Sequence, residues 1–325
     1  MRLFDPEVVT APTAVPGAGE VPAEPEAVPE PAPSPAVPKA APTGPLCRVM
    51  LLVAYDGGPF HGFAFQPGQL TVAGKLAEAI GRVAGHAVTL RCAGRTDSGV
   101  HAAGQVVHAD VAESFWGSYP DAGRLARSLS HQVGPEIAVL DVRRAPEGFD
   151  ARHSALSRRY RYLVLRSPAP DPLLRHMTWH VPGELDVAAM RIGADALLGE
   201  HDFAAFCRRP PDGASMVRRI TDSSLRVDSS TGLLAIEIEA NAFCHQMVRS
   251  VVGALVSVGE GRLTAASILE ILRSGDRSRG SRLAPPEGLC LMSVRYPDEM
   301  VPGAVWRPPT VEASRAGSLS AAPVA

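Results

Sequence analysis

The order of predicted strands and helices is the feature that most constrains the fold of this chain. Residues 47 to 143 alternate in the order strand, helix, strand, strand, helix, strand. Residues 158 to 296 repeat that order, with one additional short helix before the last strand. Each set is typical of a split β-α-β unit with an antiparallel four-stranded sheet. The sequence therefore predicts an α+β fold built from two ferredoxin-like (βαββαβ) repeats.

Hydrophobic periodicity and stop signals set the bounds of these elements. In the first repeat we predict strands over 48–55, 88–92, 105–111 and 137–143, and helices over 71–84 and 121–133. In the second we predict strands over 158–165, 216–227, 233–240 and 289–296, and helices over 186–198, 244–258 and 265–272.

The two ends of the chain differ from this pattern. Residues 1–45 hold 12 of the 30 prolines and no apolar periodicity, which predicts a disordered extension. Residues 298–325, rich in Pro, Ala and Ser, predict a flexible tail. The predicted domains between them are 46–147, which carries a Gly-rich loop discussed below, and 148–297. No secretory signal and no apolar run of 18 residues is present, so no membrane partner is expected.

Charge and cysteine content bound the function classes. Residues 1–45 carry a net charge of −4 and residues 298–325 one of −1, so the region between carries +3 against a total of −2. This mildly basic region permits a polyanionic partner. All but two of the 32 basic residues are arginines, which favours phosphate contacts, although a composition bias explains the excess equally well. The five cysteines show no C-x-x-C spacing, which predicts a reducing, cytoplasmic location and no structural zinc.

The loop from Gly94 to Ala103 is the strongest single candidate for chemistry. Its glycines bracket Arg95, Thr96, Asp97 and Ser98, so a sharp turn presents one carboxylate, that of Asp97, from a rigid base. An Asp in such a turn also commonly accepts backbone N–H bonds and does nothing more. The loop fits G-x-x-x-x-G, but Val100 and His101 replace the Lys and Ser/Thr of a phosphate loop, which disfavours nucleotide hydrolysis.

Three further clusters carry polar chemistry. Strand alternation places Arg158, Tyr160 and Tyr162 on one face, which suits a flipped base and its phosphates, or tyrosines that pack inward. Arg249 lies early in a helix, where the dipole disfavours a cation unless an anion such as Asp97 or a phosphate pairs with it; solvation is the plainer explanation. The loop of Arg273, Arg277, Arg279 and Arg282 grips phosphates or is merely solvated. We interpret the adjacent Cys244 and His245 as core packing.

Taken together, these motifs resemble the tRNA pseudouridine synthase A family over about residues 47 to 296. The resemblance rests on motifs in one order: Tyr55-Asp56-Gly57-Gly58-Pro59-Phe60-His61-Gly62, Gly94 to Ala102, Phe149-Asp150-Ala151-Arg152 with Ser157 to Tyr162, Gly199-Glu200-His201-Asp202-Phe203, Asn241-Ala242-Phe243 with Met247-Val248-Arg249, and Ala284-Pro285-Pro286-Glu287-Gly288-Leu289. The loop Phe63-Ala64-Phe65-Gln66 departs from the family, which more often has a Trp and an additional Gln there.

The resemblance implies a homodimeric enzyme without metal or cofactor that converts uridine to pseudouridine at positions 38 to 40 of the tRNA anticodon arm. It implies two ferredoxin-like domains joined along one mostly antiparallel sheet. It also implies that Asp97 is catalytic, that Tyr160 contacts the base, that Arg95 and Arg249 lie beside Asp97, and that Leu289 lines the base pocket. We therefore expect the site at the seam between the repeats. The alternative is a non-catalytic RNA-binding or RNA-chaperone protein on the same fold, against which the intact Arg-Thr-Asp loop argues.

Overall fold

The computed structural model describes residues 40–209, 213–280, 282–301 and 305–306. By its internal contacts the chain divides into Met1–Ala36 and Val37–Ala325, so both repeats belong to the second unit. Most of the predicted disordered extension and flexible tail lies outside the described residues. The predicted domain boundary between residues 147 and 148 stays a prediction.

The first repeat has the strand pairing of a ferredoxin-like unit. Its elements are β1 (Leu46–Tyr55), α1 (Val72–Ala84), β2 (Arg91–Cys92), β3 (His101–Ala112), α2 (Glu113–Gly117), α3 (Ala122–Val133) and β4 (Ile137–Arg144). Strand β1 lies between β4 and β3 and is antiparallel to both, and β2 pairs antiparallel with β3. The order β4-β1-β3-β2 follows from two β-α-β crossings wound around the central β1.

The second repeat has the same arrangement with more connections. Its elements are β5 (Ser157–Leu165), β6 (Trp179–His180), α4 (Val187–Asp195), β7 (Gly199–Asp202), β8 (Val217–Asp228), β9 (Leu233–Ala240), α5 (Met247–Gly259), α6 (Ala265–Ser274), β10 (Leu289–Arg295) and β11 (Val305–Trp306), with 3-10 turns at Ala204–Phe206 and Arg277–Arg279. The strand order is β10-β5-β9-β8-β7, in which all neighbours are antiparallel, and the short β6 pairs parallel with the end of β5.

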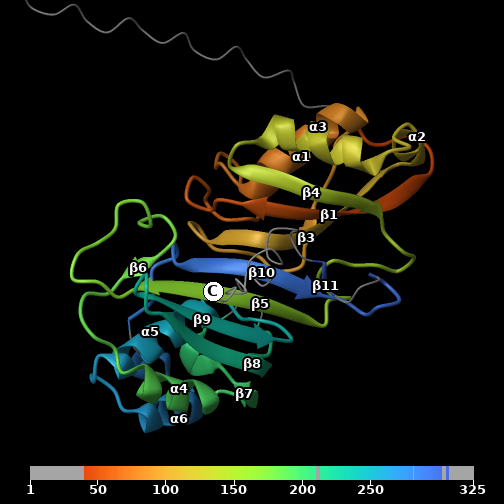
Figure 1. The fold of residues 1–325 in the computed structure, drawn as a ribbon. Coiled ribbons are helices and arrows are strands. Elements are labelled where there is room, and N and C mark those ends of the chain that lie inside the picture. Colours follow the sequence, from red (N-terminus) through yellow and green to blue (C-terminus); the bar gives the residue numbers. More distant parts are fainter. Residues whose placement is uncertain (1–39, 210–212, 281, 302–304, 307–325) are drawn as a thin grey trace, which may run out of the picture. The chain divides into compact units, whose positions relative to one another are not determined.

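One short parallel pairing joins the two repeats. The first residues of β3 pair with the first residues of β10, His101 with Cys290 and Ala102 with Leu291. The sheet thus continues from one repeat into the other, as Figure 1 shows at the centre of the described chain. The predicted α+β fold of two ferredoxin-like repeats along one mostly antiparallel sheet is confirmed.

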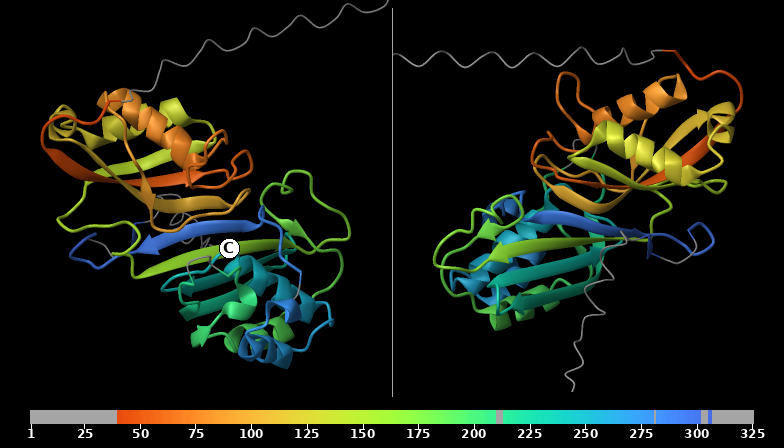
Figure 2. Two further views of the ribbon diagram at one scale, coloured as in Figure 1. Left: turned by 180° about the vertical axis from the view of Figure 1, so that it is seen from behind. Right: turned by 45° about the horizontal axis from the view of Figure 1, so that its top comes forward.

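The helices are formed by amphipathic segments with polar caps. In α1 the apolar side chains of Leu76 and Ile80 are buried, the hydroxyl of Thr71 accepts the N–H of Gly74, and Gly85 ends the helix in the left-handed region. Helices α1 and α3 lie beside β1 and β4, whereas α4, α5 and α6 lie together beside β8 and β9 (Figures 1 and 2). Each repeat therefore has its own helical layer, and the seam between β3 and β10 lies between the layers.

The structure departs from the predicted bounds in ways that matter for the site. Strand β3 begins at His101, four residues before the predicted start, so the Asp97 loop is shorter than expected. Strand β2 has two residues where five were predicted. Helix α5 begins at Met247 and not at residue 244, because Gln246 adopts a left-handed backbone with φ of 64°. Within the predicted flexible tail, β11 pairs antiparallel with β10.

Candidate active site

The loop that carries Asp97 connects β2 to β3 and is anchored by its neighbours in sequence. The buried hydroxyls of Thr96 and Tyr55 lie 2.8 Å apart, so Thr96 points into the core and not outward with Asp97. At the start of the loop, the Gln105 amide donates to the carbonyl of Gly94 at 2.6 Å. These bonds leave Asp97, with 28% of its side chain exposed, as the carboxylate that the loop presents away from its own core. The loop is a rigid support for that group.

The segment between β1 and α1 packs so closely against this loop that the two backbones are in contact. The N–H of Phe63 donates to the carbonyl of Thr96 at 3.1 Å. A Cβ on Gly62, whose φ is +92°, would lie 2.9 Å from the carbonyl oxygen of Thr96, and one on Gly57 would lie 2.0 Å from that of Val100. Only glycine allows these approaches. This explains why the glycines of the first motif accompany the Asp97 loop.

Arg158 is a structural residue that ties the loop to the second repeat. Its side chain is buried, and its guanidinium donates to the backbone carbonyl of Ala93 at 2.9 Å and to that of Asn241 at 2.7 Å. Further bonds go to the carbonyls of Ala155 and Arg152. Of the two alternatives for this strand face, the structure therefore favours inward packing, because the donors of Arg158 are already used by the protein. The RNA-binding alternative thereby loses part of its support.

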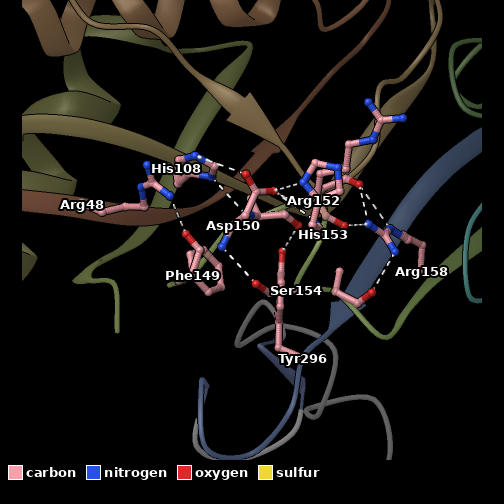
Figure 3. Close-up of polar contacts among 12 residues, drawn as sticks. Arg48, His108, Phe149, Asp150, Arg152, His153, Ser154, Arg158 and Tyr296 are labelled. Atoms are coloured by element: carbon pink, nitrogen blue, oxygen red, sulfur yellow. Dashed lines mark hydrogen bonds and ion pairs between the residues drawn. The ribbon is translucent and has the colours of Figure 1, made fainter. Parts of the chain in front are cut away.

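The turn that holds Arg158 is itself bonded to several strands (Figure 3). The carboxylate of Asp150 accepts the N–H groups of Arg152 and His153 at 2.8 and 2.9 Å. His108 on β3 accepts the N–H of Ala151 at 3.0 Å through Nδ1. Additional anchors on this turn are Arg48, which donates to the carbonyl of Phe149, and Tyr296, which donates to that of Ala151. The Phe149-Asp150-Ala151-Arg152 motif therefore fixes the junction of the repeats.

Asp97 meets two side chains from the start of α5. Arg249 Nη1 lies 3.4 Å from Oδ2 of Asp97, and the same guanidinium donates from Nε to the carbonyl of Ala284 at 2.8 Å. His245 Nε2 lies 3.3 Å from Oδ1. Only 12% of the Arg249 side chain is exposed, against 48% for His245. The carboxylate therefore lies between a mostly covered cation and a half-exposed imidazole, both from the second repeat.

Tyr160 on β5 lies next to the same loop. Its ring packs edge-to-face on Phe243 at 5.1 Å, and a Cβ on Gly94 would lie 3.5 Å from its hydroxyl. Burial raises the pKa of Tyr160 well above its ordinary value, and the negative charge of Asp97 acts in the same direction. The phenol is therefore neutral at physiological pH. It offers an aromatic edge and an O–H group beside Gly94, at the start of the Asp97 loop.

Leu289 and Arg95 are placed differently from Tyr160. Leu289 begins β10, is buried, and pairs in register with Tyr162, whose hydroxyl donates to the carbonyl of Pro285 at 2.8 Å. Arg95 is exposed and has no hydrogen-bond or ion-pair partner among the described residues. The structure thus brings Asp97 and Arg249 into contact, and leaves Arg95 directed to solvent.

The Arg-bearing loop is partly tied to the protein. Arg277 donates to the side chain of Gln246 at 2.7 Å, and Arg282 pairs with Glu260 and lies over the ring of Trp179. Arg273 and Arg279 are exposed. These two are the members of the loop that remain available to a polyanion.

The interpretation of His245 as core packing is wrong, because 48% of its side chain is exposed and its Nε2 faces Asp97. His245 lies four residues before Arg249, a spacing that would put both on one face of a continuous helix. That spacing was the available signal. The actual arrangement depends on the left-handed Gln246 between them. Because of this residue, α5 begins at Met247 and His245 lies outside the helix.

Other features of the described residues do not compete with this site. They contain no cluster of three or more His, Cys, Asp or Glu side chains that could hold a metal ion, and no helix among them has the length and apolar character to cross a membrane. A hollow of about 500 Å³ is bordered by Cys47, Arg48, Asp110 and Phe149, and by none of the residues around Asp97. Its Arg48 and Asp110 pair with each other. The convergence of charged groups therefore lies at Asp97.

Comparison with known proteins adds a family to this geometry. The sequence model of a family described as tRNA pseudouridine synthase matches residues 194–297. A protein of Frankia casuarinae named tRNA pseudouridine synthase A is 47% identical over 79% of this chain and 92% of its own length. Proteins of the same name from Streptomyces griseus and Leifsonia xyli are 42% and 41% identical, over 77% and 78% of this chain and 88% and 93% of their own lengths.

Among solved structures, a Cbf5-Nop10-Gar1 complex matches 76% of this chain and 59% of its own chain, with 10% identity. The TM-score of 0.30 is too low for this likeness to bear on fold or function.

Proposed function

The chain belongs to the tRNA pseudouridine synthase A family, and from this membership we propose that it converts uridine to pseudouridine in tRNA, with Asp97 as the catalytic carboxylate. The observation that carries the proposal is the position of Asp97, on a braced loop of one repeat and in contact with Arg249 of the other. The target is proposed to be uridine at positions 38 to 40 of the anticodon arm.

The chemistry suits a lone carboxylate. The reaction breaks the C1′–N1 glycosidic bond, turns the uracil, and rejoins it to C1′ through C5, with no net oxidation or hydrolysis. Asp97 acts either as a nucleophile at C1′ or as a base on the sugar, and both routes start from the ionised form. The guanidinium of Arg249 lies 3.4 Å from Oδ2 of this carboxylate.

The detached uracil needs a partner while it turns. The target nucleotide must leave its stack to reach the carboxylate, and base-modifying enzymes read such a flipped base by stacking and hydrogen bonds. The neutral, buried Tyr160 supplies both kinds of contact next to Asp97. Leu289, buried at the start of β10, is proposed as an apolar wall of the same base site.

Binding of the RNA phosphates requires cationic side chains that do not already form ion pairs within the protein. Arg95 is proposed as a direct RNA contact because it lies two residues before Asp97 and is exposed without a partner among the described residues. A homodimer that binds tRNA between its subunits and a cytoplasmic location complete the proposal. The five cysteines are free, which fits a reducing compartment.

The position of modification is tested with defined substrates. A tRNA transcript with tritium at C5 of its uridines releases tritium when C5 becomes bonded to C1′. We expect release from a transcript with uridine at positions 38 to 40 and none from one in which those positions are cytidine. Equal release from both transcripts would contradict the proposed position but not the synthase activity.

A further inference from the structure

The second contact of the Asp97 carboxylate, His245, has no other polar partner for its ring among the described residues. Its Nε2 lies 3.3 Å from Oδ1, whereas Arg249 approaches the other oxygen, Oδ2, at 3.4 Å. An imidazole that merely filled a surface would not need to face a carboxylate. The two oxygens of Asp97 are thus met separately, one by each residue.

The backbone around His245 is held in an uncommon conformation that directs the ring to Asp97. Gln246 is the one non-glycine residue with positive φ in the described chain, and such strain persists only where neighbouring groups hold it. Arg277 donates to the Gln246 side chain at 2.7 Å, and the N–H of Arg208 donates to the His245 carbonyl at 3.0 Å. Two separate segments therefore fix the residues on which the direction of the ring depends.

A contact at each oxygen restricts the Asp97 carboxylate more than a contact at one oxygen does. The terminal torsion of an aspartate is broad and roughly two-fold, so a carboxylate held at one oxygen still rotates about its Cβ–Cγ bond. A donor on the second oxygen removes that freedom. Because 48% of the His245 side chain and 12% of the Arg249 side chain are exposed, the imidazole holds the carboxylate on its more exposed side.

We propose that His245 is a positioning residue, which rests on the proposed synthase function: its Nε2–H donates to Oδ1 of Asp97 and fixes the carboxylate for its reaction with the flipped nucleotide. A donor is present at Nε2 both in the imidazolium and in one neutral tautomer. The contact is long in the free protein, as catalytic contacts often are, and it shortens when substrate occupies the site.

The test compares three substitutions in the full chain. In His245→Gln the side-chain amide places an N–H donor near the position of Nε2, whereas in His245→Asn the shorter side chain does not reach it. His245→Ala removes the donor altogether. His131→Ala, in the exposed part of α3, is the matched control. Each protein is assayed for tritium release at saturating tRNA and across tRNA concentrations, and its thermal unfolding midpoint is measured.

We expect kcat of His245→Ala and His245→Asn to fall about tenfold or more, because small misplacements of a reacting group cost up to about 100-fold. KM for tRNA should stay within about twofold, and His245→Gln should recover most of the rate. His131→Ala should match wild type. If the alanine variant proves unstable, the comparison of kcat between the Gln and Asn variants still tests whether a donor at the Nε2 position matters.

Three results would overturn the role of His245: wild-type kcat in the alanine variant, a Gln variant no faster than the Asn variant, or a loss confined to KM. Asp97→Asn, assayed beside them, separates this failure from that of the proposed function. An active wild type, an inactive Asp97→Asn and a fully active His245→Ala refute only the positioning role. A wild type that releases no tritium from tRNA refutes both.

Discussion

Asp97 and Arg249 are separated by 152 residues and belong to different repeats, yet their side chains lie 3.4 Å apart. The loop of Asp97 depends on β2 and β3, and Arg249 depends on the turn that opens α5. The site is therefore complete only when the two repeats are joined at β3 and β10. Substitutions on either side of this junction should affect the same chemical step.

The first prediction concerns Arg249, which makes two contacts that a lysine cannot make together. In Arg249→Lys the charge remains, but the simultaneous bonds to Ala284 and Asp97 are lost. We expect kcat/KM for tRNA to fall by about 10- to 100-fold, or roughly 1.4 to 2.7 kcal/mol. Arg124→Lys, in the exposed first turn of α3, should change it by less than about twofold. A lysine variant as active as wild type would show that the simultaneous contacts of Arg249 with Ala284 and Asp97 are unimportant for activity.

Tyr160 should contribute through its hydroxyl as well as its ring. Tyr160→Phe preserves the edge-to-face contact with Phe243 and removes only the O–H group beside Asp97. We expect the rate of pseudouridine formation to fall while the thermal midpoint changes by no more than a few degrees. Tyr119→Phe is a matched control, because Tyr119 packs edge-to-face on Phe115 in the first repeat. Equal activity of the Tyr160 variant and this control would remove the hydroxyl from the mechanism.

Arg158 should matter for stability and not for direct RNA contact. Arg158→Met leaves buried carbonyls, including those of Ala93 and Asn241, without a donor, at about 1–3 kcal/mol each. We expect the free energy of unfolding in urea to fall by about 3 kcal/mol or more. Arg161→Met, on the opposite face of β5 and paired with Glu237, should cost no more than about 1 kcal/mol. Unchanged stability with weakened tRNA binding would restore Arg158 as a phosphate ligand.

The His108 contact predicts acid sensitivity of the folded state. Burial lowers the pKa of His108, whose Nδ1 must stay unprotonated to accept the N–H of Ala151. The unfolded state therefore takes up a proton first, so stability is complete above the unfolded pKa of about 6.5 and decreases as pH falls below it.

Asp150 acts in a lower pH range than His108. Burial raises the pKa of Asp150, but the N–H groups of His153 and Arg152 outweigh burial and lower it. The stability that Asp150 contributes is therefore lost only below about pH 4.

The contribution of His108 is measured by urea unfolding between pH 7.5 and 5, above the range of Asp150. His108→Asn, which can accept the same N–H through Oδ1, should show a flatter curve. Parallel curves for this variant and wild type would assign the sensitivity to another group.

Much of the fold was predictable because hydrophobic periodicity and stop signals are local. The strand Leu233–Ala240 has the predicted bounds, and the two β-α-β-β-α-β sets are confirmed. The start of β3 at His101 was not predictable, because its first residues are extended by pairing with β10 from the other repeat. Long-range pairing of this kind leaves no periodic signal in the segment itself.

The site was predictable in part. The dipole argument for Arg249 named Asp97 as one anionic partner, and the two are in contact. His245 was missed because its direction depends on a left-handed Gln246 held by Arg277, a tertiary effect on one torsion. The role of Arg158 stayed open because strand alternation gives the face of a side chain and not its partners. Its burial under the turn at Asp150 requires the tertiary structure.

The most direct test of the account is tritium release from C5-labelled tRNA by Asp97→Asn, which preserves the shape of the side chain and removes its charge. We expect release to fall by at least about 1,000-fold, with tRNA binding and the thermal midpoint maintained. Asp228→Asn, at the exposed end of β8, should release tritium at the wild-type rate. Release by Asp97→Asn at the wild-type rate would contradict the catalytic role of this carboxylate.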